Sequence, residues 1–347
     1  MSGLAFNIGK RRVGDGQPCF VIAEIGSNHN QSLQLAYEHI DAAVEAGADA
    51  VKFQTFKASQ HYSKFTPGFN YLDNKDTWSL IQSLELNREW HVLLKQHAES
   101  KGVEFFSSPC DVEAIEELAQ LDVCAYKVAS FDLPDSRLIG QMARHGKPVI
   151  LSTGMADHAD IRAGIEACRA VGNDQVVLLQ CTSLYPAPAR LSNLVAMNAM
   201  RSAFGVLTGY SDHTVGDHIP LAAAAMGACM LEKHFTLDRK LPGPDHSFGM
   251  EPAELKDMIL KLRDIEAAMG DGAKNGPRAE EQEMFQKGRR SLHALRPIAA
   301  GATIDSADLT VKRPGLGISP REIDRVVGRK AASDIPVDHW ISWDLLV

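Results

Sequence analysis

Short apolar runs rich in β-branched residues alternate with longer segments of helical periodicity between Cys19 and about Phe235. In the first helical segment, apolar residues recur every three or four positions, as at Leu33, Ala36 and Ile40. The runs predict eight strands: Phe20–Ile25, Ala50–Gln54, Val103–Ser107, Ala125–Ala129, Val149–Ser152, Val176–Gln180, Val206–Tyr210 and Met230–His234. Eight strand–helix alternations predict an α/β fold, the closed parallel (β/α)₈ or TIM barrel.

A doubly wound open sheet is the alternative that this alternation leaves. Such sheets commonly carry a glycine-rich fingerprint directly after the first strand. The chain instead continues through the polar segment from Glu24 to His29, which lacks that spacing of glycines. The pattern therefore favours the barrel.

The alternation of strands and helices stops after the last strand–helix unit. Residues 251–269 predict one amphipathic helix, and the charged, glycine-containing stretch from Gly270 to Glu283 predicts a linker. From about Arg289, short β-type runs alternate with turns. We expect a barrel domain over 1–270, a linker over 271–288 and a small, mostly β domain over 289–347, a size that is only marginally stable alone.

Composition limits the class of function. The 347 residues include 45% hydrophobic and 23% charged residues, and the net charge is −8. This acidic balance argues against a nucleic-acid partner. The chain has no apolar run of membrane-spanning length, and its polar N-terminal segment does not resemble a signal peptide. We expect a cytoplasmic protein without a membrane partner.

Six cysteines are scattered along the chain without any C-x-x-C pair. This spacing argues against a zinc site or a disulfide framework. Most of the cysteines lie in apolar stretches, and we expect them to be small buried side chains.

The predicted strands end in polar residues, at the edge where a TIM barrel carries its active site. Because side chains alternate along a strand, Lys52 shares a face with Gln54, and Ser211 shares one with His213. Glu232 and His234 form a third such pair, so that Asp212 and Lys233 would point outward. The full set at the strand ends is Glu24, Lys52, Gln54, Ser107, Ser108, Lys127, Ser152, Thr153, Thr182, Ser211, His213, Glu232 and His234.

Two features of this set point to chemistry. Lys52 and Lys127 lie in apolar surroundings, and a buried ammonium needs a partner such as a bound phosphate or carboxylate. His213 and His234 end neighbouring strands and are placed to bind one divalent metal; with oxygen ligands they suit Mn²⁺, Mg²⁺ or Co²⁺. Isolated residues elsewhere say less: Asp157 and His158 predict a helix start, and His246 caps a turn.

Eight motifs in order carry a family resemblance: the segments 24–29, 52–55, 126–127, 151–155, 180–186, 209–214, 232–235 and 242–246. Together they resemble the N-acetylneuraminate (sialic acid) synthase family, which includes legionaminate and pseudaminate synthases and spore-coat polysaccharide relatives. The tail, with Val311 to Pro314, resembles the antifreeze-like (SAF) domain attached to these enzymes.

The resemblance implies a metal-dependent condensation of phosphoenolpyruvate with an N-acylated amino sugar. It implies catalytic roles for Glu24, Lys52, Lys127, His213 and His234, the two histidines being the ligands of Mn²⁺ in the first place, with Mg²⁺ or Co²⁺ as alternatives. The residues implied to bind substrate are Gln54, Ser108, Ser130, Ser152, Tyr185, Ser211, Glu232, Asp245 and Arg313. It also implies a domain-swapped homodimer in which Arg313 reaches the partner's barrel.

The sequence does not decide which amino sugar is the substrate. The segment from Ala129 to Pro134 is closer to pseudaminate or spore-coat relatives, whereas the turn from Pro242 to His246 is closer to the neuraminate and legionaminate branches. N-acetylneuraminate is the expected product, with pseudaminate or legionaminate as alternatives. Two other functions remain to be weighed: a phosphoenolpyruvate-condensing barrel that acts on sugar phosphates, and a non-catalytic sugar- or ice-binding protein.

Overall fold

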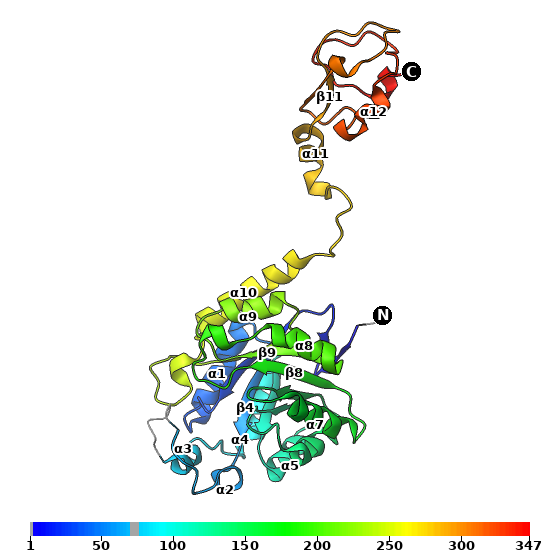
Figure 1. Cartoon of the computed structure of the whole chain (residues 1–347). Coiled ribbons are helices and arrows are strands. Elements are labelled where there is room, and N and C mark those ends of the chain that lie inside the picture. The colour runs from blue at the N-terminus through cyan, green and yellow to red at the C-terminus, as the bar shows by residue number, and fades with distance from the viewer. Residues whose placement is uncertain (1–2, 70–75) are drawn as a thin grey trace. The chain divides into compact units, whose positions relative to one another are not determined.

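The computed structural model describes residues 3–69 and 76–347, which form two compact units, Met1–Gly270 and Asp271–Val347. The first unit contains a closed barrel of eight parallel strands surrounded by helices (Figure 1). The strands run in the order β10-β3-β4-β5-β6-β7-β8-β9. The predicted barrel is confirmed, and the open doubly wound sheet is excluded because β10 pairs with β3.

The barrel strands agree with the predicted runs to within a few residues at their ends. They are β3 Phe20–Gly26, β4 Ala50–Thr55, β5 Glu104–Pro109, β6 Tyr126–Val128, β7 Val149–Ser152, β8 Val176–Cys181, β9 Leu207–Asp212 and β10 Met230–His234. Almost every strand residue is buried, because one face lines the barrel interior and the other packs under the helices.

The outer layer consists of helices that each bury one apolar face. They are α1 Leu33–Ala46, α4 Trp90–Ser100, α5 Val112–Gln120, α6 Ser136–Ala143, α7 His158–Arg169, α8 Val195–Phe204, α9 His218–Ala225 and α10 Pro252–Met269. Helix α1 begins where the Ser32 side chain accepts a hydrogen bond from the Leu35 amide, and it ends at Gly47 with φ +92°. Asp157 caps α7 through a capping box, as the sequence predicted.

Two elements of the first unit were not predicted. An N-terminal hairpin, β1 Ala5–Ile8 and β2 Arg11–Gly14, packs Ile8 and Val13 into the barrel core. The Lys10 amide donates to a carboxylate oxygen of Glu104 at the start of β5. Because Glu104 begins its strand, the hairpin lies at the end of the barrel opposite the strand C-termini. The second addition follows β4, where the connection contains the short helices α2 Ala58–His61 and α3 Thr77–Ser83.

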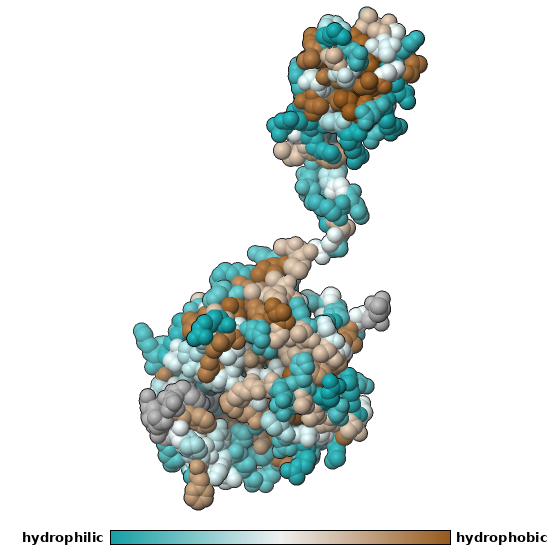
Figure 2. Space-filling model, in the orientation of Figure 1, coloured by the Kyte–Doolittle hydropathy of each residue, from teal (hydrophilic) through white to brown (hydrophobic). Residues whose placement is uncertain are grey.

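The second unit has its own small core of residues such as Leu292, Ile304 and Ile341. It contains the antiparallel strands β11 Ser291–Ala294 and β12 Leu309–Lys312 and the short helix α12 Ile323–Val326. A further helix, α11 Gln282–Gly288, lies within the stretch expected to be linker. On the faces seen in Figure 2, polar and apolar residues are mixed on each unit. Within 3–69 and 76–347, no helix is both long and apolar enough to cross a lipid bilayer.

Candidate active site

A cavity opens at the C-terminal ends of the barrel strands. Every barrel residue predicted to bind substrate or metal lines it: Glu24, Lys52, Gln54, Ser108, Lys127, Ser130, Ser152, Tyr185, Ser211, His213, Glu232, His234 and Asp245. Parallel strands place their carboxyl ends at one edge, and the strand register puts Glu24 beside Lys52 and His234 beside Glu24. The remaining predicted residue, Arg313, belongs to the second unit, where its side chain donates to the Gly288 carbonyl at 2.6 Å.

Two lysines and two glutamates form the charged floor of this cavity. Lys52 Nζ lies 2.7 Å from Glu24 Oε2 and 3.8 Å from Glu232 Oε2, and Lys127 Nζ lies 3.9 Å from Glu232 Oε1. All four side chains are buried. The ammonium groups therefore have carboxylate partners, which a buried cation requires.

Burial and neighbouring charges set the protonation of these groups. Burial alone would lower the pKa of Lys52, but the carboxylates of Glu232 and Glu24 outweigh it and raise that pKa. Burial lowers the pKa of Lys127, and the attraction of Glu232 offsets this lowering only in part. Burial also raises the pKa of Glu24, whereas Lys127 and Lys52 outweigh burial at Glu232 and lower its pKa. Glu232 is therefore the permanent anion between the lysines, and Glu24 is the carboxyl better able to hold a proton.

Hydroxyl groups surround the lysines. Lys127 Nζ donates to Ser152 Oγ at 2.7 Å, Lys52 Nζ to Ser108 Oγ at 3.3 Å, and Ser211 Oγ to Glu232 Oε1 at 2.9 Å. Ser130 Oγ accepts from the Gly154 amide at 3.0 Å. The cavity floor thus combines two cations with short hydroxyl donors, a set that suits a small, multiply charged anion.

The two histidines lie side by side, His213 directly after β9 and His234 at the end of β10. Their ring centroids are 5.3 Å apart, and both rings contact Tyr185. His213 Nδ1 lies 2.7 Å from the carbonyl oxygen of Thr182 and donates to it, which leaves Nε2 as a free acceptor. His234 Nδ1 is buried without a hydrogen-bond partner among the described residues.

These rings meet the requirements of metal ligands. Burial lowers the pKa of His213 and, together with the nearby His213 ring, lowers that of His234 further, so both imidazoles are neutral at pH 7. Asp245 Oδ2 lies 3.7 Å from His234 Nδ1, and burial raises the pKa of Asp245 to about 7. Neutral imidazole nitrogens without competing protons fit a divalent ion that takes nitrogen and oxygen ligands.

Asp212 and Lys233 were expected to point outward from the barrel interior. The two are neighbours in the register of β9 and β10 and form a buried ion pair. Asp212 also accepts from the Thr214 amide, and Lys233 donates to the Thr214 carbonyl. This pair therefore fixes both ends of the turn that carries His213.

Sequence reasoning missed several cavity residues in the loops after the strands. His61, Cys110 and Asp132 line the cavity, although Cys110 was expected to be only a small buried side chain. Residues outside strands do not alternate between two faces, so the alternation of side chains along a strand could not identify them. Gly154 lies in a loop, where a single glycine says little on sequence grounds, but a Cβ there would lie 2.3 Å from Ser183 Oγ and 2.9 Å from Ser130 Oγ. His246 is buried between Thr236 and Asn30 and is structural.

Known proteins resemble the chain over nearly its whole length. The model of the NeuB family matches residues 39–274, and that of the SAF domain matches residues 289–347. The N,N'-diacetyllegionaminic acid synthase of Legionella pneumophila is 40% identical, covering 95% of each chain. The pseudaminic acid synthase of Helicobacter pylori is 35% identical over 94% of this chain and 98% of its own.

A solved structure agrees with these relatives. The N-acetylneuraminic acid (sialic acid) synthetase of Leptospira borgpetersenii, in complex with citrate, superposes with a TM-score of 0.73 at 34% identity. The match covers 82% of this chain and 95% of that one. The chain is therefore an enzyme of the NeuB family, the family of sialic, legionaminic and pseudaminic acid synthases, and it carries a C-terminal SAF domain.

Proposed function

We propose that the chain joins phosphoenolpyruvate, an N-acylated amino sugar and water into a nine-carbon nonulosonic acid and releases phosphate. The observation that carries the proposal is the convergence of two buried lysines, four serines and two neutral histidines in one cavity. Phosphoenolpyruvate has a phosphate and a carboxylate, and Lys52 and Lys127 with Ser108, Ser130, Ser152 and Ser211 supply cations and hydroxyl donors for both.

The sugar lies above this anion, toward the cavity mouth. Gln54, Tyr185, Glu232 and Asp245 offer it hydrogen-bonding groups at the C-terminal ends of β4, β8 and β10. His213 and His234 would hold a divalent ion, Mn²⁺ in the first place, whose Lewis acidity polarises the aldehyde oxygen of the open-chain sugar.

The reaction balances with water as the third reactant. Carbon 3 of phosphoenolpyruvate attacks the aldehyde carbon, positive charge develops at carbon 2, and water adds there. The bond between carbon 2 and the phosphate oxygen then breaks. Glu24 donates the proton that the new hydroxyl gains or accepts the one that the water loses, because its buried carboxyl has a raised pKa. Gln54 Nε2 donates to Glu24 Oε1 at 2.7 Å and orients this carboxyl.

This order of events predicts cleavage of the C–O bond of phosphoenolpyruvate. With ¹⁸O in the bridging position, mass spectrometry should find the label in the released phosphate. Label retained in the sugar acid would refute the mechanism.

N-acetylmannosamine is the proposed sugar, and a diacylated amino sugar is the second candidate. The second is favoured by the name of the Legionella relative, an N,N'-diacetyllegionaminic acid synthase. The Helicobacter relative, a pseudaminic acid synthase, and the Ala129–Pro134 segment favour the pseudaminate alternative. Phosphate release should be measured across a panel of N-acylated sugars, each with and without phosphoenolpyruvate. A sugar that gives a high kcat/KM identifies the substrate, and no phosphate release with any of them would overturn the proposed function. A sugar phosphate as best substrate would favour the related condensing barrels.

The working unit is proposed to be a homodimer in which the SAF domain of one chain closes the barrel of the other. Large apolar side chains are exposed in four successive strand-end loops: Phe131, Met155, Leu184 and Val215. Exposed apolar groups clustered on one rim are typical of an interaction surface. Arg313 would then contact the acyl group of the sugar in the partner's barrel.

A further inference from the structure

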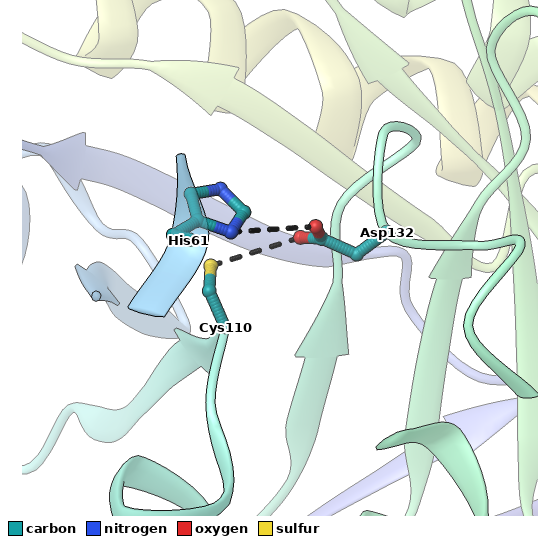
Figure 3. A group of neighbouring side chains, drawn as sticks. All are labelled: His61, Cys110 and Asp132. Atoms are coloured by element: carbon teal, nitrogen blue, oxygen red, sulfur yellow. Dashed lines mark hydrogen bonds and ion pairs between the residues drawn. The ribbon is translucent and has the colours of Figure 1, made fainter. Parts of the chain in front are cut away.

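A second group of potential metal ligands lies in the same cavity, away from the two histidines. His61 ends α2, Cys110 directly follows β5, and Asp132 lies in the loop after β6 (Figure 3). Each offers one donor atom, and these atoms all lie within 4.8 Å of one another. The trio comes from the β4–β6 side of the mouth, whereas His213 and His234 come from β9 and β10.

The Asp132 carboxylate lies at distances from His61 and Cys110 that are close to those between ligands of a tetrahedral zinc ion. Asp132 Oδ1 lies 3.9 Å from His61 Nδ1, and Asp132 Oδ2 lies 3.7 Å from Cys110 Sγ. Ligands bound to zinc at ordinary bond lengths are about 3.3 to 3.6 Å apart. Small side-chain rotations would close the difference. The His61 ring is held in place by stacking against Phe56, with centroids 6.1 Å apart.

We propose that His61, Cys110 and Asp132 form a second divalent-cation site that selects zinc-class metals. One thiolate, one imidazole and one carboxylate are ligands that Zn²⁺ and Co²⁺ accept, whereas Mg²⁺ and Mn²⁺ prefer oxygen. Three protein ligands leave a fourth position, and all three residues line the cavity, so that position faces the cavity. The absence of a C-x-x-C pair could not exclude this site, because its ligands come from three separate connections, those after β4, β5 and β6.

Metal binding must displace the proton of the Cys110 thiol. Burial and the neighbouring carboxylates of Asp132 and Asp111 raise the pKa of this thiol, and Lys52 opposes them only in part. In the metal-free state the thiol has two acceptors within reach, Asp132 Oδ2 and the Ser108 carbonyl oxygen. A zinc-class ion bonds the sulfur and releases the proton to solvent. The bound ion would tie together the loops after β4, β5 and β6.

A metal ion at this second site would affect the reaction, an expectation that rests on the proposed function. An ion with its open position in the cavity would occupy space at the mouth through which the sugar enters. Zinc would therefore inhibit the Mn²⁺-loaded enzyme by binding here as well as by exchange at the histidine pair.

The test uses the full chain, stripped of metal and titrated with Co²⁺. Cobalt bound through a thiolate gives a near-ultraviolet charge-transfer band, whereas cobalt bound only through histidines and oxygens does not. We expect the band in wild type, its displacement by Zn²⁺ and its loss in Cys110→Ser. In Asp132→Asn and His61→Asn the affinity measured from the band should fall at least about ten-fold.

Two controls separate this site from other cobalt binding. The band should persist in Cys124→Ser, whose thiol does not line the cavity, and in the double variant His213→Ala/His234→Ala. No band in folded wild type, or a band that survives in Cys110→Ser, would overturn the proposal. If Cys110→Ser does not fold, an unchanged cobalt affinity in His61→Asn would overturn the proposal instead. Because the band is read without substrate, the result is independent of whether phosphate release is found.

Discussion

His213 shows how one backbone contact prepares a side chain for its role. Its Nδ1 donates to the Thr182 carbonyl, which fixes the tautomer and leaves Nε2 as the acceptor. The turn around it is held by the buried pair of Asp212 and Lys233. As the proposed metal ligand, His213 would bind without first losing a proton or reorienting.

We predict that His213→Ala abolishes binding of Mn²⁺ and with it phosphate release. Removing one of two protein ligands should weaken metal affinity by at least about a hundred-fold, as measured by equilibrium dialysis. Chelation of wild type should stop turnover, and Mn²⁺ or Mg²⁺ should restore it. His218→Ala is the matched control because His218 is exposed at the start of α9. Full activity and unchanged metal affinity in His213→Ala would contradict the assignment.

His91 makes the barrel sensitive to acid. The ring is buried against Thr55 Oγ1, 2.9 Å from Nε2, and burial lowers its pKa to about 4. The unfolded chain takes up a proton below about pH 6.5, while the folded chain does so only near pH 4. The unfolded state therefore binds more protons in this window, and the free energy of unfolding falls as the pH falls through it.

The neutral variant His91→Gln should flatten this dependence. Between pH 7.5 and pH 5 it should lose about 2 kcal/mol less than wild type, measured by urea unfolding of the barrel. His145→Gln, at a partly exposed position in the α6–β7 connection, is the control for replacing a histidine that is not buried. Equal slopes in wild type and His91→Gln would show that the ring is not kept neutral.

At the scale of elements, β9 and β10 cooperate through their outward side chains. Lys233 and Asp212 are buried together beneath the outer layer of the barrel.

Lys233→Met should cost about 3–5 kcal/mol of unfolding free energy, because it leaves the Asp212 carboxylate buried and unpaired. The double variant Lys233→Met/Asp212→Leu should recover most of that loss in the same urea titration. A double variant as unstable as the single one would mean that the turn at Thr214, rather than the charge pair, carries the stability.

Alternation along strands is what made the barrel and much of its cavity predictable. A period of two fixes which side of the sheet Lys52, Ser211 and Glu232 occupy as soon as the strands are located. The N-terminal hairpin escaped because its strands have four residues each, too few for a pattern. The trio of His61, Cys110 and Asp132 escaped because loop geometry depends on contacts between distant segments, which no local spacing records.

At the scale of the whole molecule, the proposed dimer can be tested by mixing inactive chains. His234→Ala removes the metal site and Arg313→Ala removes the acyl contact, so each variant alone should be inactive. Refolded together, half of the dimers should be mixed, with one intact site in two, and activity should recover to about a quarter of wild type.

The recovery depends on which barrel Arg313 serves. If it serves the barrel of its own chain, every site in the mixture lacks one residue and phosphate release stays at the level of the single variants. That outcome, with mixed dimers demonstrated by native mass spectrometry, would exclude the domain swap. A mixture of His234→Ala with His213→Ala is the control that cannot recover, because both changes lie in the barrel.

Closure of the barrel pairs its first strand, β3, with its last strand, β10. Glu24 and His234, at the C-terminal end of this seam, line the cavity. Glu24 on β3 pairs directly with His234 on β10, although more than half of the sequence separates them. A ribosome-bound chain that ends before β10 therefore has neither the seam nor the second histidine. The proposed metal site would therefore be complete only once the last barrel strand has formed. An ion held by the two histidines would stabilise the closed barrel over open forms by mass action, so the proposed cofactor would also stabilise the fold.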